Sequence, residues 1–173
     1  MLKYVDAKVV FAEVPDEVTL AINISNCPCQ CKGCHSSYLA QDIGEPLVWW
    51  AEYSNEEHSI DTCIEELIES NEGITCICLM GGDSEPELIN ALANEIKYNY
   101  DGIKTAWYSG RQELSNSIDL SYFDYIKLGP YKEEFGPLNS RTTNQRFYKV
   151  NGRELVDITS RFYERNLETC SGI

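Results

Sequence analysis

Residues 74–86 have the sequence ITCICLMGGDSEP, and this stretch predicts the class of the fold. Residues 74–80 are an unbroken apolar run of strand length, which is typical of a strand buried on both faces of a parallel sheet. Gly81 and Gly82 then predict a turn, and Pro86 suits the first position of a helix. We therefore expect a strand that passes through a glycine turn into a helix, as in α/β proteins.

The sequence on either side continues the alternation of strands and helices. Residues 18–24 suit an earlier strand, and residues 104–108 and 125–128 suit two later ones. Asn151-Gly152 lies between residues 145–150 and 154–159, and this pair strongly indicates a hairpin turn. Helices are expected at residues 59–70, 86–100 and 111–117. The order predicts a mainly parallel sheet with right-handed crossovers and a C-terminal β-hairpin.

Length and charge restrict the possibilities further. The chain has 173 residues, with 14 Lys or Arg and 28 Asp or Glu, so its net charge is −14. We expect a single domain over residues 1–173, because a complete eight-fold β/α barrel usually needs about 250 residues. A partial barrel fits this length. The acidic balance argues against binding to nucleic acid or to an anionic membrane surface.

The cysteine content indicates a reducing compartment. The chain has 8 cysteines, no apolar run of the roughly 18 residues that span a bilayer, and no secretory signal at Met1. These features predict a cytoplasmic protein. In the cytoplasm, clustered cysteines more often bind metal or carry out redox chemistry than form disulfides.

Four loops are expected to meet at one edge of the sheet. The cysteine-rich loop of residues 25–36 follows the first core strand, and residues 81–83 follow the second. Residues 108–110 and Gly129-Pro130 follow the next two. Because ligands of such sheets bind outside the carboxyl ends of the strands, we expect these loops to form one site.

The cysteine-rich loop carries the strongest chemical signal. Its residues 26–35 are NCPCQCKGCH, in which Cys27, Cys31 and Cys34 have the spacing Cys-x3-Cys-x2-Cys. Three thiolates on one short loop can hold three irons of a four-iron cluster and leave the fourth iron open to a substrate. Ferredoxins differ, because four cysteines close their clusters. An exchangeable position is what metal-centred catalysis requires.

A structural zinc site is the alternative for this loop. The same three cysteines, with Cys29 or His35 as the fourth ligand, could supply the tetrahedral set that zinc prefers. The spacing alone leaves both interpretations open. The surroundings favour the cluster, because a structural zinc site needs neither a preceding strand nor a Gly-Gly-Asp strand end about 50 residues later.

The motif order resembles the radical S-adenosylmethionine superfamily. Cys-x3-Cys-x2-Cys follows the first core strand, and Gly-Gly-Asp follows the second. Within that superfamily, the short length and the string CKGCH at residues 31–35 resemble the activating proteins of anaerobic ribonucleoside-triphosphate reductases. WYSG at residues 107–110 and RTTNQ at residues 141–145 are further matches, so the resemblance runs from about residue 18 to residue 150. Two departures are Gly33, where many members have an aromatic residue, and Asp83, where many have Glu.

The resemblance implies a fold, two cofactors and a reaction. The fold would be a partial β/α barrel of the radical S-adenosylmethionine type. Cys27, Cys31 and Cys34 would ligate a [4Fe–4S] cluster, and S-adenosylmethionine would chelate the open iron. One electron from the reduced cluster would cleave the sulfonium carbon–sulfur bond, giving methionine and a 5′-deoxyadenosyl radical. That radical would take a hydrogen atom from a glycine of the partner enzyme.

The resemblance also implies the residues that bind the cofactor. Gly81 and Gly82 would let the backbone approach it, and Asp83 would accept hydrogen bonds from its ammonium group. Tyr108 and Ser109 are candidates for its carboxylate or adenosine. A further candidate is Asn144, on a loop that could reach back over the site. Lys127 lies in a short apolar strand, points either to the site or outward, and is assigned no role. Cys29 is likewise assigned no role.

The implied partners are the glycyl-radical subunit of an anaerobic ribonucleoside-triphosphate reductase and an electron donor such as flavodoxin or ferredoxin. Two alternatives stay open. The chain could activate another glycyl-radical enzyme, or it could be a non-catalytic zinc or iron–sulfur binding module.

Overall fold

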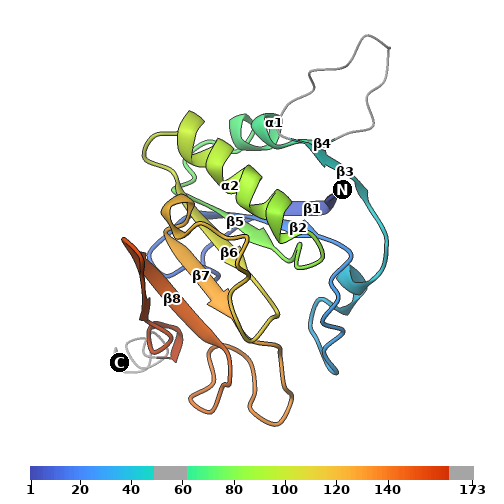
Figure 1. Ribbon diagram of the computed structural model, residues 1–173, viewed down its shortest axis with the longest axis vertical. Helices are drawn as coiled ribbons and strands as arrows, with labels where there is room; N and C mark the ends of the chain where they lie inside the picture. Colours follow the sequence, from blue (N-terminus) through green and yellow to red (C-terminus); the bar gives the residue numbers. More distant parts are fainter. Residues whose placement is uncertain (49–61, 164–173) are drawn as a thin grey trace, which may run out of the picture.

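The computed structural model describes residues 1–48 and 62–163. Within these residues, nine strands form one sheet in the order β4-β3-β1-β2-β5-β6-β7-β8-β9 (Figure 1). The strands are β1 (Lys3–Val10), β2 (Thr19–Ile24), β3 (Glu45–Val48), β4 (Thr62–Cys63), β5 (Cys76–Met80), β6 (Lys104–Tyr108), β7 (Tyr125–Leu128), β8 (Arg146–Asn151) and β9 (Glu154–Asp157). The helices are α1 (Ile64–Glu69) and α2 (Pro86–Asn99), with short 3-10 turns η1 (Ser37–Ala40) and η2 (Leu120–Tyr122).

The sheet is mixed, which corrects the expectation of a mainly parallel one. The central strands β2, β5, β6 and β7 are parallel, as predicted. At their flanks β1 pairs antiparallel with β2 and β3, and β7, β8 and β9 pair antiparallel in series. Parallel neighbours need a crossover, commonly a helix, whereas antiparallel neighbours need only a loop. No helix interrupts the described chain between β1 and β2 or between β7 and β8, which fits their antiparallel pairing.

Two of the expected local features are confirmed and one is wrong. The helix after the glycine turn is α2, which begins at Pro86, and the hairpin at Asn151-Gly152 joins β8 to β9. The expected helix at residues 111–117 is absent from the described chain. The Ser115 hydroxyl there accepts a hydrogen bond from the backbone N–H of Ser117 at 3.3 Å, and such local bonds compete with helix formation.

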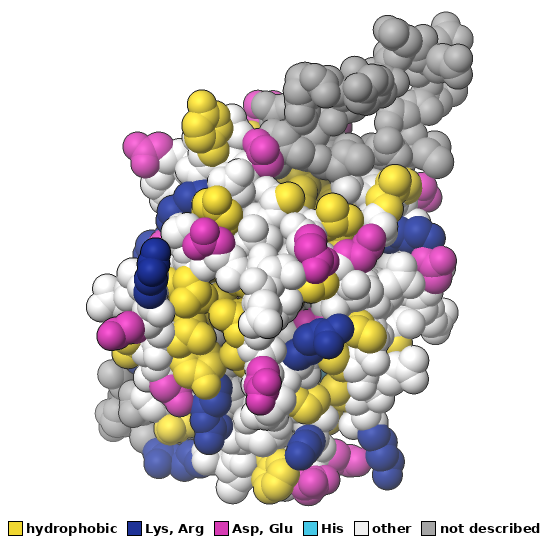
Figure 2. All heavy atoms as spheres, viewed as in Figure 1, with side chains coloured by type: hydrophobic (Ala, Val, Ile, Leu, Met, Phe, Trp, Pro, Cys, Tyr) yellow, Lys and Arg dark blue, Asp and Glu magenta, His cyan; other side chains and the backbone are white. Residues whose placement is uncertain are grey.

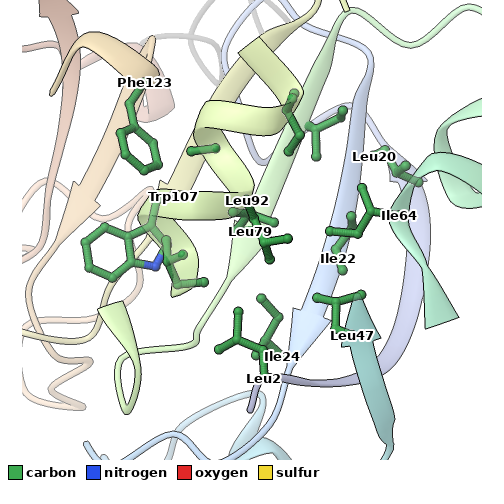
Figure 3. Packing of buried hydrophobic residues seen from close by; sticks show 14 of the residues in the cluster. Leu2, Leu20, Ile22, Ile24, Leu47, Ile64, Leu79, Leu92, Trp107 and Phe123 are labelled. Atoms are coloured by element: carbon green, nitrogen blue, oxygen red, sulfur yellow. The ribbon is translucent and has the colours of Figure 1, made fainter. Parts of the chain in front are cut away.

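The main hydrophobic core lies between the sheet and α2 (Figures 1 and 3). Side chains alternate across the sheet, so Ile77 and Leu79 of β5 join the core under α2. Cys76 and Cys78 of the same strand join a smaller cluster on the opposite face with Phe147. Burial on both faces explains why residues 76–80 are continuously apolar.

Charged side chains of both signs are spread over the face seen in Figure 2. None of the helices in the described chain is long and apolar enough to cross a membrane.

Candidate cysteine-lined site

A pocket of about 530 Å³ opens at the carboxyl ends of the parallel strands. Its wall is built from the cysteine-rich loop after β2, the turn after β5, the segment after β6 and the end of β7. Predicted site residues among the lining are Cys27, Cys31, Cys34, Gly81, Asp83, Tyr108 and Ser109. The loops after β2, β5 and β6 therefore meet in one place as expected, whereas Gly129 and Pro130 after β7 do not line the pocket. The volume lies in the range of small-molecule sites.

The cysteine loop is wound by three residues with positive φ. Asn26 has φ +59°, Gln30 has φ +42° and Gly33 has φ +72°, and each directly precedes one cysteine of the Cys-x3-Cys-x2-Cys motif. Left-handed backbone favours glycine and tolerates asparagine. Gly33 therefore suits its position, because its positive φ would strain the aromatic residue that many radical S-adenosylmethionine proteins have there.

The thiols around the pocket are partly exposed and form no disulfide bonds. Cys27, Cys29, Cys31 and Cys34 are all free cysteines. Burial raises the pKa of Cys27, and the Asp83 carboxylate raises it further. Burial is also the main reason that the pKa of Cys29 rises to about 12, with Asp83 and Cys27 adding to it. Without a bound cation these two thiols therefore keep their protons at neutral pH.

Cys29 lies close to Gly110, the second residue after β6. A Cβ added to Gly110 would lie 2.7 Å from its Sγ atom, so the absence of a side chain at Gly110 makes room for the thiol. Ligand atoms of Cys27, Cys29 and Asp83 lie within 4.8 Å of one another, close enough to share a single metal ion. In a four-iron cluster each cysteine binds a different iron, so the sulfur atoms of Cys27, Cys31 and Cys34 need not lie within 4.8 Å of one another.

The two glycines after β5 have different roles. The Gly81 carbonyl accepts a hydrogen bond from Trp107 Nε1 at 2.8 Å, and its amide donates to the Tyr108 carbonyl at 3.0 Å. Gly82 faces the core instead, because a Cβ there would lie 2.4 Å from the Ile89 side chain. Gly81 thus lines the pocket, while Gly82 lets α2 pack close to the turn.

Asp83 is held by its neighbours rather than left free. Its side chain is 1% exposed and accepts hydrogen bonds from Ser109 Oγ at 2.5 Å and from the Gly110 amide at 2.9 Å. Arg111 donates to the Asp83 backbone carbonyl at 2.9 Å. A carboxylate with four lone-pair sites keeps acceptor capacity after two such bonds.

Tyr108 is oriented by the segment that follows β1. Its hydroxyl donates to the Glu13 backbone carbonyl at 2.5 Å, and burial raises its pKa well above the ordinary value. Glu13 also lines the pocket, and burial raises its pKa against the opposing effects of Tyr108 and His35. No sequence signal pointed to Glu13, because its place depends on how the chain folds back between β1 and β2.

Lys127 points to the site and lines the pocket. It is 7% exposed, and its ammonium donates to the Gly129 carbonyl at 2.6 Å and the Ser109 carbonyl at 3.3 Å. Burial lowers the pKa of Lys127 to about 8, although Asp83 and the cysteines oppose this shift. In the sequence, Lys127 stands out as a charged residue inside an otherwise apolar strand, Tyr125–Leu128.

Asn144 is not among the residues that line the pocket, whereas its neighbour Gln145 is. The Asn144 side-chain amide donates to the Pro130 carbonyl at 2.9 Å and so braces the loop after β7. Its Oδ1 atom is buried and has no hydrogen-bond partner among the described residues. Seven of the nine predicted site residues therefore line the pocket, whereas Gly82 and Asn144 do not.

The residues present fit an iron–sulfur cluster with a small polar ligand beside it. Three free cysteines of the predicted spacing line one pocket, and a buried carboxylate, a buried lysine and strand-end backbone groups line the rest. Thiolates suit iron–sulfur clusters and zinc alike, so the donor set alone does not choose between them.

No protein-family model, curated protein or solved structure matches the chain.

Proposed function

We propose that this protein is an activating enzyme that cleaves S-adenosylmethionine reductively at a [4Fe–4S] cluster held by Cys27, Cys31 and Cys34. Its protein substrate would be the glycyl-radical subunit of an anaerobic ribonucleoside-triphosphate reductase. The observation that carries the proposal is the convergence of the cysteine motif with the strand ends at Gly81–Asp83 and Tyr108–Gly110 in one pocket. The parallel strands β2, β5, β6 and β7 would be the retained part of a β/α barrel.

The cluster would supply the electron that breaks the carbon–sulfur bond, and the chain would supply binding, orientation and exclusion of water. Asp83 would accept a hydrogen bond from the ammonium group of the ligand, in an orientation that its bonds from Ser109 and Gly110 fix. Backbone carbonyls at the end of β5 are further acceptors. Lys127 offers a cation to the same space.

An enzyme whose substrate is a protein loop needs an open approach to its cofactor. The four pocket cysteines are partly exposed, which suits such an approach. The electron would come from a donor such as flavodoxin or ferredoxin. An oxygen-sensitive open cluster and free thiols are compatible with the reducing cytoplasm.

Anaerobic reconstitution with iron and sulfide tests the proposal. After addition of dithionite and S-adenosylmethionine, wild-type protein should release 5′-deoxyadenosine, and Cys31→Ala should release none. Cys76→Ala is the matched control, because Cys76 is fully buried in the cluster on the other face of β5 and does not line the pocket. It should keep about four irons per chain and the activity. Radical formation on the reductase, followed by electron paramagnetic resonance, then separates this partner from other glycyl-radical enzymes.

A single-metal site is the second candidate, favoured by the mutual approach of Cys27, Cys29 and Asp83. This alternative predicts about one zinc per chain and no cleavage of S-adenosylmethionine. It also predicts that Cys29→Ala lowers metal content as much as Cys27→Ala does. Under the cluster proposal, Cys27→Ala should lower the iron content far more than Cys29→Ala.

A further inference from the structure

Lys127 is a buried cation whose hydrogen bonds do not neutralise its charge. Both of its acceptors, the Ser109 and Gly129 carbonyls, are uncharged. Lysine is rarely buried this deeply without a paired charge, because removing an ammonium from water costs several kcal/mol. The burial of Lys127 therefore suggests that its positive charge serves a function at the pocket.

Lys104 on the neighbouring strand β6 differs, because its charge is paired with a carboxylate. It stands at the opposite end of the sheet, where its ammonium pairs with the buried carboxylate of Glu17. Lys127 instead lies at the pocket end, where the groups acting on its charge are Asp83 and the thiols of Cys29, Cys31 and Cys34.

We infer that Lys127 is a positioning residue whose buried positive charge sets the reduction potential of the cluster at Cys27, Cys31 and Cys34. The inference rests on the proposed function, since it needs a cluster at those cysteines. A cluster there would hold the three cysteines as thiolates, which would add negative charge near the ammonium beside that of Asp83. Charge and hydrogen bonding around a cluster are recognised means by which a protein tunes its potential.

The direction of the effect follows from the redox step. One electron passes from dithionite to the oxidised cluster, no covalent bond forms or breaks, and the site becomes more negative by one charge. A fixed positive charge nearby favours the reduced state, and in a pocket of low dielectric constant water screens it weakly. Replacing Lys127 by a neutral residue should therefore move the midpoint potential to a more negative value.

The test measures iron and sulfide content and then the midpoint potential of the reconstituted protein without S-adenosylmethionine. Lys127→Met and Lys127→Gln remove the charge, and Lys127→Arg keeps it. Lys149→Met is the matched control, because it removes the same charge from an exposed position on the adjacent strand β8. We expect a negative shift in both neutral variants, a potential near the wild-type value in Lys127→Arg, and no shift in Lys149→Met.

The outcomes separate the two proposals. A wild-type protein that holds no four-iron cluster overturns the proposed function, and this inference with it. A cluster whose potential is unchanged in the neutral variants overturns the inference alone. If the neutral variants lose the cluster while Lys127→Arg keeps it, the charge serves to hold the cluster and not to set its potential, which overturns the inference. Loss of the cluster in all three Lys127 variants would mean that the lysine acts only through its shape and hydrogen bonds, which also overturns the inference.

Discussion

The hydroxyl of Ser109 donates a hydrogen bond of 2.5 Å to the carboxylate of Asp83, and both side chains are 1% exposed. This bond joins the residue after β6 to the turn after β5 across two neighbouring parallel strands. The Gly110 amide holds the other carboxylate oxygen at 2.9 Å. The pocket wall is therefore organised before any ligand binds, and its acidic group cannot rotate freely.

Ser109→Ala should destabilise the metal-free protein by about 1.5–3 kcal/mol, because a buried carboxylate loses a donor. Urea unfolding under reducing conditions measures this. Ser121→Ala is the matched control, since Ser121 Oγ also donates to a carboxylate, that of Asp119, but in an exposed position. It should cost less than about 0.5 kcal/mol. Equal losses in the two variants would show that burial does not strengthen the Ser109 bond.

Gly82→Ala should cost more stability than Gly102→Ala, although both glycines have similar positive φ values of +77° and +84°. A Cβ at Gly82 would lie 2.4 Å from Ile89, whereas nothing lies within 4 Å of one at Gly102. The backbone penalty of about 1–2 kcal/mol is shared, and overpacking adds about 1–3 kcal/mol at Gly82 alone. Thermal unfolding of the two variants measures the difference. Indistinguishable losses would mean that Ile89 moves aside without cost.

The central part of the fold was predictable because its signals are local. Residues 74–86 combine a continuous apolar run, a glycine pair and a helix-starting proline, and the structure has β5, the turn and α2 there. The position of the pocket followed from topology alone, since loops after parallel strands meet at one edge. The Asn151-Gly152 turn predicted the antiparallel pairing of β8 with β9, but no local signal predicted that β7 pairs with β8 or β1 with β3, because long stretches of chain separate those partners.

The orientation of Lys127 could have been derived from its own strand. Ile126 and Leu128 belong to the core under α2, and Tyr125 belongs to the cluster on the other face. Strict alternation then places Lys127 on the face of Tyr125, away from the helices. Asn144 was a different case. Its position in a loop offers no such periodicity, so its hydrogen bond to Pro130 could be found only from the structure.

Tyr125→Phe should destabilise the protein by roughly 1–2 kcal/mol, since its hydroxyl donates to the buried Glu17 carboxylate at 3.0 Å. The Thr75 hydroxyl, at 2.7 Å, and Lys104 still donate to Glu17 in the variant, so the loss stays below that of an unpaired buried charge. Chemical denaturation measures it. Tyr98→Phe is the control, because Tyr98 is 85% exposed and its hydroxyl is in water. A loss in Tyr98→Phe as large as in Tyr125→Phe would contradict the assignment.

Cys78→Ala should change how stability depends on pH. Burial raises the pKa of Cys78 well above its ordinary value of 9.0. The folded protein therefore keeps a proton that the unfolded chain releases, and the stabilisation that is present below pH 9 is lost as the pH rises beyond it. At pH 7.5 the variant should be less stable by about 1 kcal/mol, because a small buried group is removed.

Above pH 9 this difference should shrink, since the wild-type protein alone must hold Cys78 protonated. Urea unfolding at pH 7.5, 9 and 10.5 in the presence of a reductant follows the trend. Subtracting the curve of the variant removes the contributions of the other titrating groups, Cys76 among them. A difference that stays constant across this range would show that Cys78 does not couple folding to proton binding.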